Sequence, residues 1–424
     1  MAAKLIHGKT YWVANVVVFF SFCVHMTHAG LDTVNNATTN NGVEGTFGQK
    51  LEIEKLLKKL NKQAVKSIKS PDGDIIDCVS ILNQPAFDHP KLQNHKIKMR
   101  PTFRPEEKTI SENSKMSSIV QPWHQIGSCP KGTIPIRRTR KEDILRARTI
   151  QQFGKKNLKT VRLRSYVAGQ GGHEYASVFV KGGKYYGGKA TMSIWEPTVL
   201  KDEYSISQIW VISDADSQNL NTIEAGWQVH PQLYGDDATR LFTYWTSDSY
   251  KSTGCYDLLC SGFVQLDTGI AVGGRITPLS VYGDANSQYG ITIMIWKDVS
   301  NGDWWMQYGD KVMGYWDSSL FSHLFDSATA IQLGGEVLNS ESDSQHTTTQ
   351  MGSGHFPAEG FGKASYFNNI KYINGQNQLV PAGNLVPYID HSNCYDLRTD
   401  HNDDWGNFFY YGGPGHISLM FANV

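Results

Sequence analysis

The sequence lacks the usual signatures of metal-, serine- and nucleotide-dependent enzymes. His173-Glu174 has no second histidine at the spacing of a zinc motif, and no C-x-x-C pair is present. Gly352-Ser353-Gly354 has the wrong spacing for a nucleophile elbow. Gly183–Ala190 nearly matches a phosphate-binding loop, but Ala190 stands where the metal-binding hydroxyl belongs, so a glycine-rich hairpin is the favoured interpretation. We therefore expect neither a metal nor a cofactor.

The chain also lacks a net charge, because it has 40 Lys+Arg and 40 Asp+Glu. This balance offers no electrostatic basis for binding nucleic acid. Long hydrophobic runs are confined to the N-terminus, where Trp12–Val24 follows a basic start and is too short to span a bilayer comfortably. Small residues near Ala29 suit a cleavage site, so residues 1–29 are predicted to be a signal peptide. A retained signal anchor is the alternative. We expect a secreted protein, extracellular or in the cell wall, or one delivered to a vacuole, with no membrane contact after cleavage.

Cysteine is scarce, with six residues in 424. Cys23 lies in the predicted signal peptide, which leaves five in an oxidising compartment. Cys255 and Cys260 could close a tight loop, and Cys78 could pair with Cys129. Cys394 then has no obvious partner. The N-glycosylation sequon begins at Asn36.

The part before about residue 165 is polar and basic. Residues 30–48 are predicted to be disordered, residues 51–67 to form an amphipathic helix, and residues 77–81 to form a strand or buried turn. The section 85–105 is spaced by prolines and looks extended. Thr139 can cap a short helix. The arginine- and lysine-rich residues 137–164 suit either a solvated linker or a site of proteolytic processing.

After about Ser165 the chain becomes a series of short aromatic and β-branched segments separated by Gly, Asn and Asp. This spacing predicts a β-sandwich or barrel. One helix is expected, at residues 319–330. The expected strands are 176–180, 190–195, 204–212, 223–229, 241–246, 262–266, 290–297, 303–308, 331–338 and 364–370.

Two of these segments have an unusual polar face. With a period of two, Glu224 shares a face with a glycine and Gln228, opposite Ile223, Ala225, Trp227 and Val229. Glu336 likewise shares a face with Gly334 and Gln332. Such faces would make a poor solubilising surface but a good floor for a groove. Two glutamates in one groove can divide labour, because an ionised one can take a proton from water while a protonated one donates to the substrate. Solvated surface glutamates are the alternative interpretation.

Several long segments are similar to the plant neprosin family. The resemblance runs from about Leu51 to Gly415, and the segments that carry it are Trp123–Arg138, Ser207–Val211, Ile223–Tyr234, Leu241–Thr246, Gly254–Gln265, Asp303–Met306, Gly314–Trp316, Gly334–Val337 and Met351–Gly354. It implies a small α+β activation propeptide, residues 49–164 with the basic linker, followed by an all-β catalytic domain, residues 165–424, built as an antiparallel β-sandwich of two large sheets.

The resemblance further implies a glutamic endopeptidase made as a zymogen, active in acid, independent of metal and cleaving after proline. Its catalytic glutamates fall at Glu224 and Glu336, with Glu203 a lesser candidate for the first role. Gln208, Gln228 and Gln332 are candidates for substrate-binding or oxyanion support. The expected partners are a polypeptide substrate and the chain's own propeptide as an intramolecular inhibitor.

The chain departs from the family pattern at its end. Family members continue past Gly415 to a final cysteine, whereas residues 416–424 contain none, which leaves Cys394 unpaired. Two other functions remain open. Trp304, Trp305, Tyr315 and Trp316, if exposed on a sandwich, could stack on cell-wall carbohydrate. Paired carboxylates also serve glycoside hydrolysis, although the neighbouring glutamines favour a peptidase.

Overall fold

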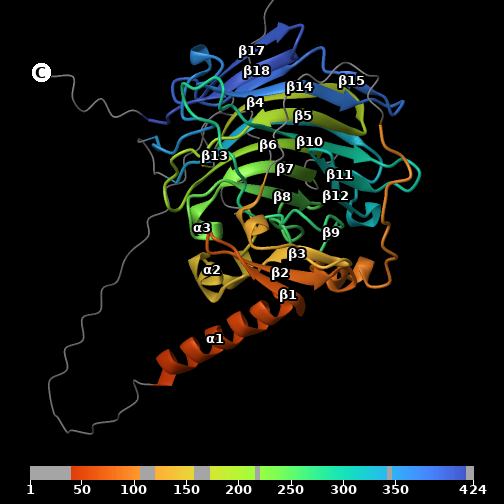
Figure 1. The fold of residues 1–424 in the computed structure, drawn as a ribbon, viewed down its shortest axis with the longest axis vertical. Coiled ribbons are helices and arrows are strands. Elements are labelled where there is room, and N and C mark those ends of the chain that lie inside the picture. The colour runs from red at the N-terminus through yellow and green to blue at the C-terminus, as the bar shows by residue number, and fades with distance from the viewer. Residues whose placement is uncertain (1–39, 106–119, 157–171, 215–219, 341–345, 417–424) are drawn as a thin grey trace, which may run out of the picture. The chain divides into compact units, whose positions relative to one another are not determined.

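Two antiparallel sheets packed face to face form the body of the protein (Figure 1). The computed structural model describes residues 40–105, 120–156, 172–214, 220–340 and 346–416, with side chains from residue 48 onward. One sheet has the strand order β16-β4-β13-β6-β7-β8, and the other has β17-β18-β14-β5-β10-β11-β12-β9 with β15 beside β14. The expected all-β sandwich of two large sheets is therefore confirmed.

The strands of the first sheet are β4 (His173–Tyr185), β6 (Tyr204–Ser213), β7 (Asn221–Val229), β8 (Arg240–Thr246), β13 (Ala328–Leu338) and β16 (Val386–Ile389). Those of the second are β5 (Gly187–Ser193), β9 (Phe263–Gln265), β10 (Gly290–Lys297), β11 (Trp304–Tyr308), β12 (Lys311–Trp316), β14 (Ser365–Ile373), β15 (Leu379–Pro381), β17 (Asp396–Asn402) and β18 (Gly406–Gly412). Every strand expected from the sequence has a counterpart here. The hairpin interpretation of Gly183–Ala190 is wrong: this segment connects β4 to β5, which lie in different sheets, so it crosses from one sheet to the other.

The predicted helix at 319–330 does not form. Ser318–Leu320 makes one 3₁₀ turn, with the Asp317 carboxylate accepting the Ser319 N–H, and β13 already begins at Ala328. Leu320, Phe321 and Leu324 are nevertheless buried. Their helix-like spacing arose from a compact loop that packs into the core, so tertiary contacts overrode the local pattern.

Both faces of strand β7 are buried, although the sandwich covers only one of them. Ile223, Ala225, Trp227 and Val229 are fully buried between the sheets, as their alternation predicts. The opposite face of β7 is buried as well, including Glu224. A single sandwich leaves that face open, so another part of the chain must cover it.

Tyr250 and Tyr256 of the sandwich's own loops supply part of the cover, and the N-terminal part of the chain supplies the rest. This N-terminal part contains α1 (Asn40–Leu60), a three-stranded sheet of β1 (Ala64–Lys69), β2 (Ile75–Ser80) and β3 (Thr133–Arg137), and α2 (Lys141–Arg146). In Figure 1 this sheet, in orange, lies beneath the end of the sandwich formed by β8 and β9. The strand expected at 77–81 is β2. The helix expected at 51–67 ends at Leu60, because β1 takes up its last residues, and it begins at Asn40, inside the segment expected to be disordered.

The cap of α2 also differs from the prediction. Arg140, not Thr139, is the N-cap residue, and the Asp143 carboxylate accepts the Arg140 backbone N–H. Thr139 is instead held by Asn61, whose side chain bonds both backbone polar groups of Thr139. The helix start is thus set by an acidic residue in the first turn, which also suits the helix dipole.

The segment 85–105 is packed rather than merely extended. It begins with 3₁₀ turns at Pro85–Asp88 and Pro90–Leu92, in which Pro85, Ala86 and Leu92 are buried. Further along, the His95 ring and the Lys98 backbone N–H contact the Tyr315 hydroxyl at 2.6 and 3.0 Å. The Trp296 indole donates to the Phe103 carbonyl. We call residues 85–105 the arm; in Figure 1 it is the orange trace that rises along the edge near β12 and β11.

The four aromatics considered for carbohydrate stacking are all fully buried. Alternation places Trp304 and Trp316 on one face of the second sheet and Trp305 and Tyr315 on the other. The second pair lies where the arm contacts Tyr315. An exposed stacking surface made of these four residues is therefore wrong for this chain.

The basic residues 137–156 are only partly solvated: Arg140, Lys141, Arg148 and Lys155 are exposed, whereas the others are at least partly buried. Arg137 pairs with Asp74 and Asp143, and Arg138 pairs with Asp77. Lys156 reaches a buried site described below. Residues 157–164 of the basic run lie outside the described residues, as do the predicted signal peptide and Asn36.

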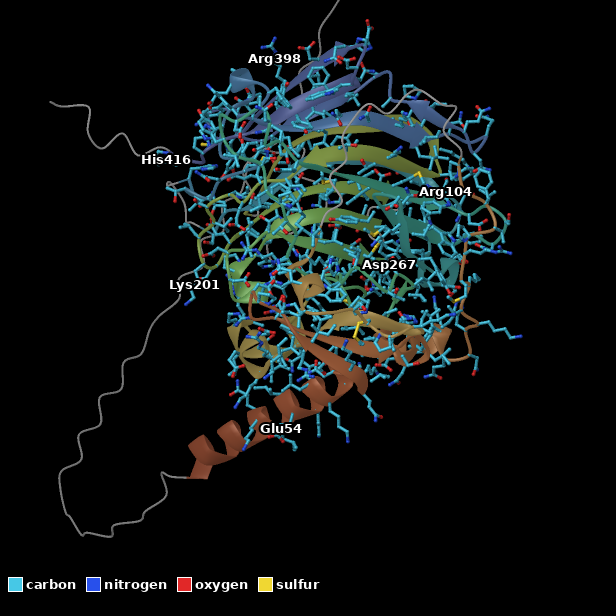
Figure 2. The ribbon with its side chains drawn as sticks, viewed as in Figure 1. Glu54, Arg104, Lys201, Asp267, Arg398 and His416 are labelled. Atoms are coloured by element: carbon cyan, nitrogen blue, oxygen red, sulfur yellow. A yellow bond between two sulfur atoms is a disulfide. The ribbon has the colours of Figure 1, made fainter. Side chains whose placement is uncertain are left out.

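Both predicted disulfides are present, Cys78–Cys129 and Cys255–Cys260, and Cys394 is buried as a free thiol. Charged side chains such as Glu54, Lys201 and Arg398 project from the surface (Figure 2). Within the described ranges, no helix is both long and apolar enough to cross a membrane.

Replacing Cys78 and Cys129 together by alanine should destabilise the N-terminal sheet by about 4 kcal/mol, because this bridge closes a loop with a sequence separation of 51. The matched control is the Cys255/Cys260 double alanine variant, whose bridge spans only 5 residues and should cost about 2 kcal/mol. Thermal unfolding followed by differential scanning calorimetry measures both. Equal losses in the two variants would contradict the loop-length argument.

Candidate functional site

The face of the first sheet that points away from the second sheet carries regular rows of side chains. Strand pairing sets Glu224 of β7 beside Trp210 of β6 and Tyr244 of β8. Two residues further along, Gly226 lies beside Gln208, which lies beside Gly334 of β13. The next row contains Gln228, Ile206 and Glu336. Glu224 and Glu336 are therefore diagonal neighbours, with Gln208 in the row between them.

Both glutamates converge on one ammonium group. The Lys156 Nζ lies 2.7 Å from the Glu224 Oε2 and 3.2 Å from the Glu336 Oε2. The three side chains are almost completely buried, with 3%, 0% and 1% of their surface exposed. Burial alone would lower the pKa of Lys156, but the two carboxylates outweigh it and raise the pKa. One buried cation balances only one of two buried anions, so further hydrogen-bond donors to the carboxylates are needed to stabilise the cluster.

Glu336 receives the larger set of donors. Gln208 Nε2 donates to its Oε2 at 2.7 Å, and the Tyr204 hydroxyl donates to its Oε1 at 3.0 Å. The His173 Nδ1 lies 2.7 Å from the same Oε1. Burial would raise the pKa of Glu336, but Lys156 and then His173 outweigh it and bring the pKa to about 2. Glu336 is thus strongly held in its ionised form.

Glu224 has a smaller set of donors. Its Oε1 accepts from the Tyr250 hydroxyl at 2.7 Å and from the Thr222 hydroxyl at 2.8 Å. Burial first, and then the charge of Glu224, raises the pKa of Tyr250 well above its ordinary value, so the phenol remains a donor. Apart from Lys156, both donors to Glu224 are neutral hydroxyls, whereas Glu336 faces an imidazole. The two carboxyl groups therefore have different environments, which is what separate acid and base roles require.

Two glycines keep the row between the glutamates free of side chains. A Cβ added at Gly226 would lie 1.9 Å from the Ser207 carbonyl oxygen. At Gly334, where φ is +148°, it would lie 2.4 Å from the Ala176 carbonyl oxygen. Gln208 therefore has no side chain beside it on either neighbouring strand, and this leaves space for the Lys156 ammonium.

The predicted supporting residues divide into two groups. Gln208 contacts Glu336 directly, and its Oε1 is buried without a hydrogen-bond partner in the described part of the chain. Gln228 donates to the Tyr234 hydroxyl and Gln332 to the Ser177 hydroxyl, so neither contacts a glutamate of the pair. Glu203, the lesser candidate, is turned away and accepts bonds from Ser340 and Thr347.

Lys156, His173, Tyr204, Thr222 and Tyr250 belong to the site but were not expected in it. Tyr204 carried a usable signal, because it lies on the same face as Gln208, four residues before it. Thr222 has the same relation to Glu224, two residues before it. Lys156 lies in the run interpreted as linker or processing site, and His173 was considered only as a zinc ligand. Among the described residues, no group of three or more His, Cys, Asp or Glu side chains could hold a metal ion.

Two family models match the chain. Residues 201–414 match the model described as Neprosin, and residues 67–179 match the model described as Neprosin activation peptide. The chain belongs to the neprosin family. The neprosin match contains Glu224 and Glu336, and the activation-peptide match contains Lys156. Membership confirms the expected peptidase class and the presence of an activation peptide.

The neprosin chain is also similar to solved structures. Scytalido-glutamic peptidase, solved with a peptide-based transition-state analogue, aligns at 10% identity with a TM-score of 0.31 and covers 57% of this chain and 98% of its own. SCP-B, an Eqolisin-family peptidase solved with the tripeptide Ala-Ile-His, aligns at 8% with the same TM-score and coverage. A chicken liver agglutinin, CG-16, aligns at 10% with a TM-score of 0.22 and covers 38% of this chain and 93% of its own. At these identities and scores, family membership rests on the two sequence models.

Proposed function

We propose that this protein is the zymogen of a secreted, acid-active glutamic endopeptidase in which Glu224 and Glu336 are the catalytic pair. The observation that carries the proposal is the convergence of both glutamates on Lys156, a residue of the activation peptide. An ammonium group is about the size of a water molecule and donates hydrogen bonds to both carboxylates. It therefore occupies the place that an attacking water takes once the peptide has left.

The surroundings of the two glutamates assign their roles. Gln208, Tyr204 and His173 all remain beside Glu336 after Lys156 leaves, and hydrogen bonds to the charged form of a carboxyl group favour ionisation. Glu336 is then the general base that takes a proton from water. Glu224, with two neutral hydroxyl donors, holds the proton that is given to the substrate carbonyl or to the leaving amine. Such a pair works in acid, where one proton is retained.

The activation peptide acts as an inhibitor in this proposal. Lys156 forms ion pairs with both glutamates and displaces water, and the residues before it fill the groove. Phe153 is buried among Leu233, Tyr234 and Leu259, and the Gly154 carbonyl accepts the Tyr256 backbone N–H. A substrate cannot approach Glu224 while this segment is in place. Cleavage after proline is proposed from the family resemblance alone.

The full-length protein should gain peptidase activity when it is moved to about pH 3–4, below the ordinary pKa of a carboxyl group. The expected result is loss of the N-terminal segment on a gel together with cleavage of a proline-containing peptide, with no effect of a metal chelator. Incubation with cell-wall polysaccharide and with model glycosides should give neither binding nor hydrolysis. Chelator-sensitive cleavage, or glycoside hydrolysis without peptide cleavage, would contradict the proposal.

A further inference from the structure

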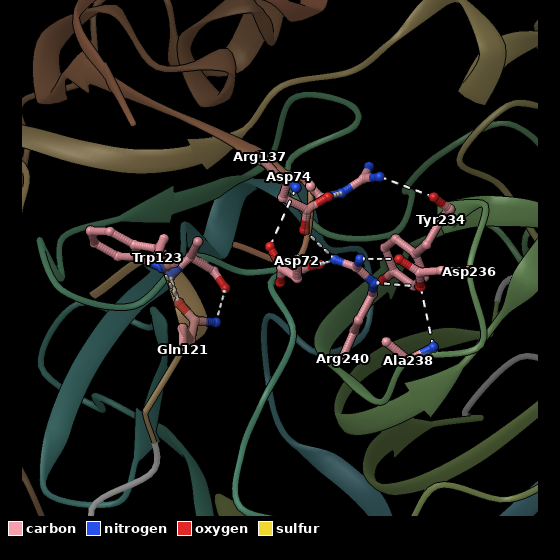
Figure 3. A network of polar contacts seen from close by, with 12 residues as sticks. Asp72, Asp74, Gln121, Trp123, Arg137, Tyr234, Asp236, Ala238 and Arg240 are labelled. Carbon is pink, nitrogen blue, oxygen red and sulfur yellow. Dashed lines mark hydrogen bonds and ion pairs between the residues drawn. The ribbon is translucent and has the colours of Figure 1, made fainter. Parts of the chain in front are cut away.

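A second activation-peptide side chain inserts its charge into the same groove, away from the glutamate pair. Asp74, in the turn between β1 and β2, accepts a hydrogen bond from the Arg240 Nη1 at 2.6 Å (Figure 3). Arg240 is the first residue of β8 and is fully buried. A buried arginine of the catalytic domain thus has one of its counter-ions in a segment that leaves on activation.

The other partners of Arg240 belong to the catalytic domain. Its Nε and Nη2 donate to the two carboxylate oxygens of Asp236 at 3.2 and 2.5 Å, and Nη1 also donates to the Gly273 carbonyl. These contacts hold the guanidinium in place without Asp74. Once the activation peptide leaves, the Arg240 Nη1 loses its carboxylate partner, while Asp236 and the Gly273 carbonyl still hold the guanidinium in its orientation. A planar, pre-oriented guanidinium edge suits recognition of another carboxylate.

Arg240 lies on the face that carries the catalytic pair. It pairs with Gln228 in the row that contains Glu336. Gln228, the partner of Arg240, lies four residues after Glu224 on β7. At the usual rise of a strand, the two positions are about 13 Å apart. An extended peptide spans that distance with about four residues. A substrate lying over the glutamates can therefore place a side chain at Arg240.

Tyr234 and Gly273, which both contact Arg240, line a cavity whose catalytic-domain side is otherwise apolar except for the Asp257 carboxyl group, which accepts from the Tyr234 hydroxyl. Leu233, Leu258 and Val272 line this cavity too, and it is completed on the other side by activation-peptide residues such as Ile136 and Phe153. Tyr234 packs against the Arg240 guanidinium, 5.0 Å from it. In such surroundings an ion pair is screened less than on an open surface. In the latent form, Asp74 thus occupies the position beside the Arg240 Nη1 that an acidic side chain of a substrate could take.

We propose that Arg240 forms a subsite for an acidic substrate side chain about four residues from the scissile bond, occupied by Asp74 in the latent form. This inference rests on the proposed function, since it assigns a substrate preference to the same groove. The subsite acts through binding, so it changes KM more than kcat.

The test compares paired fluorescent peptides that contain one proline and either Asp or Asn at each position from two to six on either side of it. The acid-activated wild-type protein should prefer Asp at one position, near the fourth, by about tenfold in kcat/KM and mainly through KM, as expected for one charge-assisted hydrogen bond. In Arg240→Gln the preference should fall to about one, and Arg240→Lys should retain part of it. The matched control is Arg275→Gln, which removes a nearby arginine that pairs with Glu196.

Equal rates for Asp and Asn peptides at every position in the wild type would overturn the subsite, and this comparison needs no variant to fold. A preference that survives in Arg240→Gln would overturn it too. If no peptide is cleaved, the proposed function fails instead. Fluorescence anisotropy of the same peptides with the acid-treated protein then decides the subsite, since tighter binding of an Asp peptide supports it and equal binding overturns it.

Discussion

Glu224→Gln and Glu336→Gln should each lower peptide cleavage in acid by about 10²- to 10⁴-fold, the range that general acid–base groups contribute. Glutamine keeps the size of the side chain and can still accept the hydrogen bonds that surround each position. It can neither take a proton from water nor carry one to the substrate. In Glu336→Gln the Gln208 amide can still donate to the new amide oxygen, and the Tyr204 hydroxyl, which bonds the other carboxylate oxygen, can turn to accept from the amide NH2, so the fold should be retained.

The measurement is kcat/KM of protein from which the N-terminal segment has been removed by the same added protease in every sample. Any difference in kcat/KM then reflects peptide-bond hydrolysis and not the removal of the N-terminal segment. The matched control is Glu203→Gln, because Glu203 is equally buried but contacts Ser340 and Thr347. It should lose stability but keep activity within a few-fold. Full activity in either Glu224→Gln or Glu336→Gln, with normal circular dichroism, would contradict the assignment.

Replacing Lys156 by methionine should remove most of the pH dependence with which the activation peptide is released. In the latent form Lys156 and His173 outweigh burial and hold the pKa of Glu336 at about 2, below the ordinary value of 4.5. Glu336 binds a proton more readily once Lys156 has left. The ion pair therefore stabilises the latent form fully above about pH 4.5, and this contribution is lost as the pH falls through about 2.

Each pKa unit corresponds to a tenfold change in equilibrium, so the wild-type release equilibrium should rise across this window, by less than about 100-fold because His173, Tyr204 and Gln208 stay beside Glu336. In Lys156→Met the rise should be much smaller and release should already occur near neutral pH. A pH series followed by gel and by initial peptidase rate measures both effects. The matched control is Lys155→Met, since Lys155 is exposed and donates only to the Ser252 carbonyl among the described contacts. Identical pH profiles for the two variants would contradict the role of Lys156.

The strands of the sandwich could be predicted because alternation is a local property. Ile223, Ala225, Trp227 and Val229 define the buried face of β7 by themselves, and the opposite face then follows. The prediction failed where apolar residues pack without regular structure, as Leu320, Phe321 and Leu324 do. Their spacing resembles one turn of a helix, but the contacts that stabilise them come from the core of the sandwich.

The candidate pair could be named, but its surroundings could not. Lys156 is separated from Glu224 by 68 residues and from Glu336 by 180. Nothing local in the basic run tells the one buried lysine from its exposed neighbours. The diagonal arrangement of the glutamates depends on the pairing register of β6 with both β7 and β13, which no single strand encodes. Asp74 and Arg240 meet for the same long-range reason.

The arm binds the second sheet, far along the chain from the lysine that fills the groove. A cut in the chain after Lys156 leaves the contacts of His95 and Lys98 with Tyr315 intact, together with the disulfide-closed sheet. The severed segment then stays docked as a separate molecule. Cleavage removes the covalent tether, so the effective concentration of the segment at the groove falls to its concentration in solution. Latency after cleavage therefore depends on how far the severed segment is diluted.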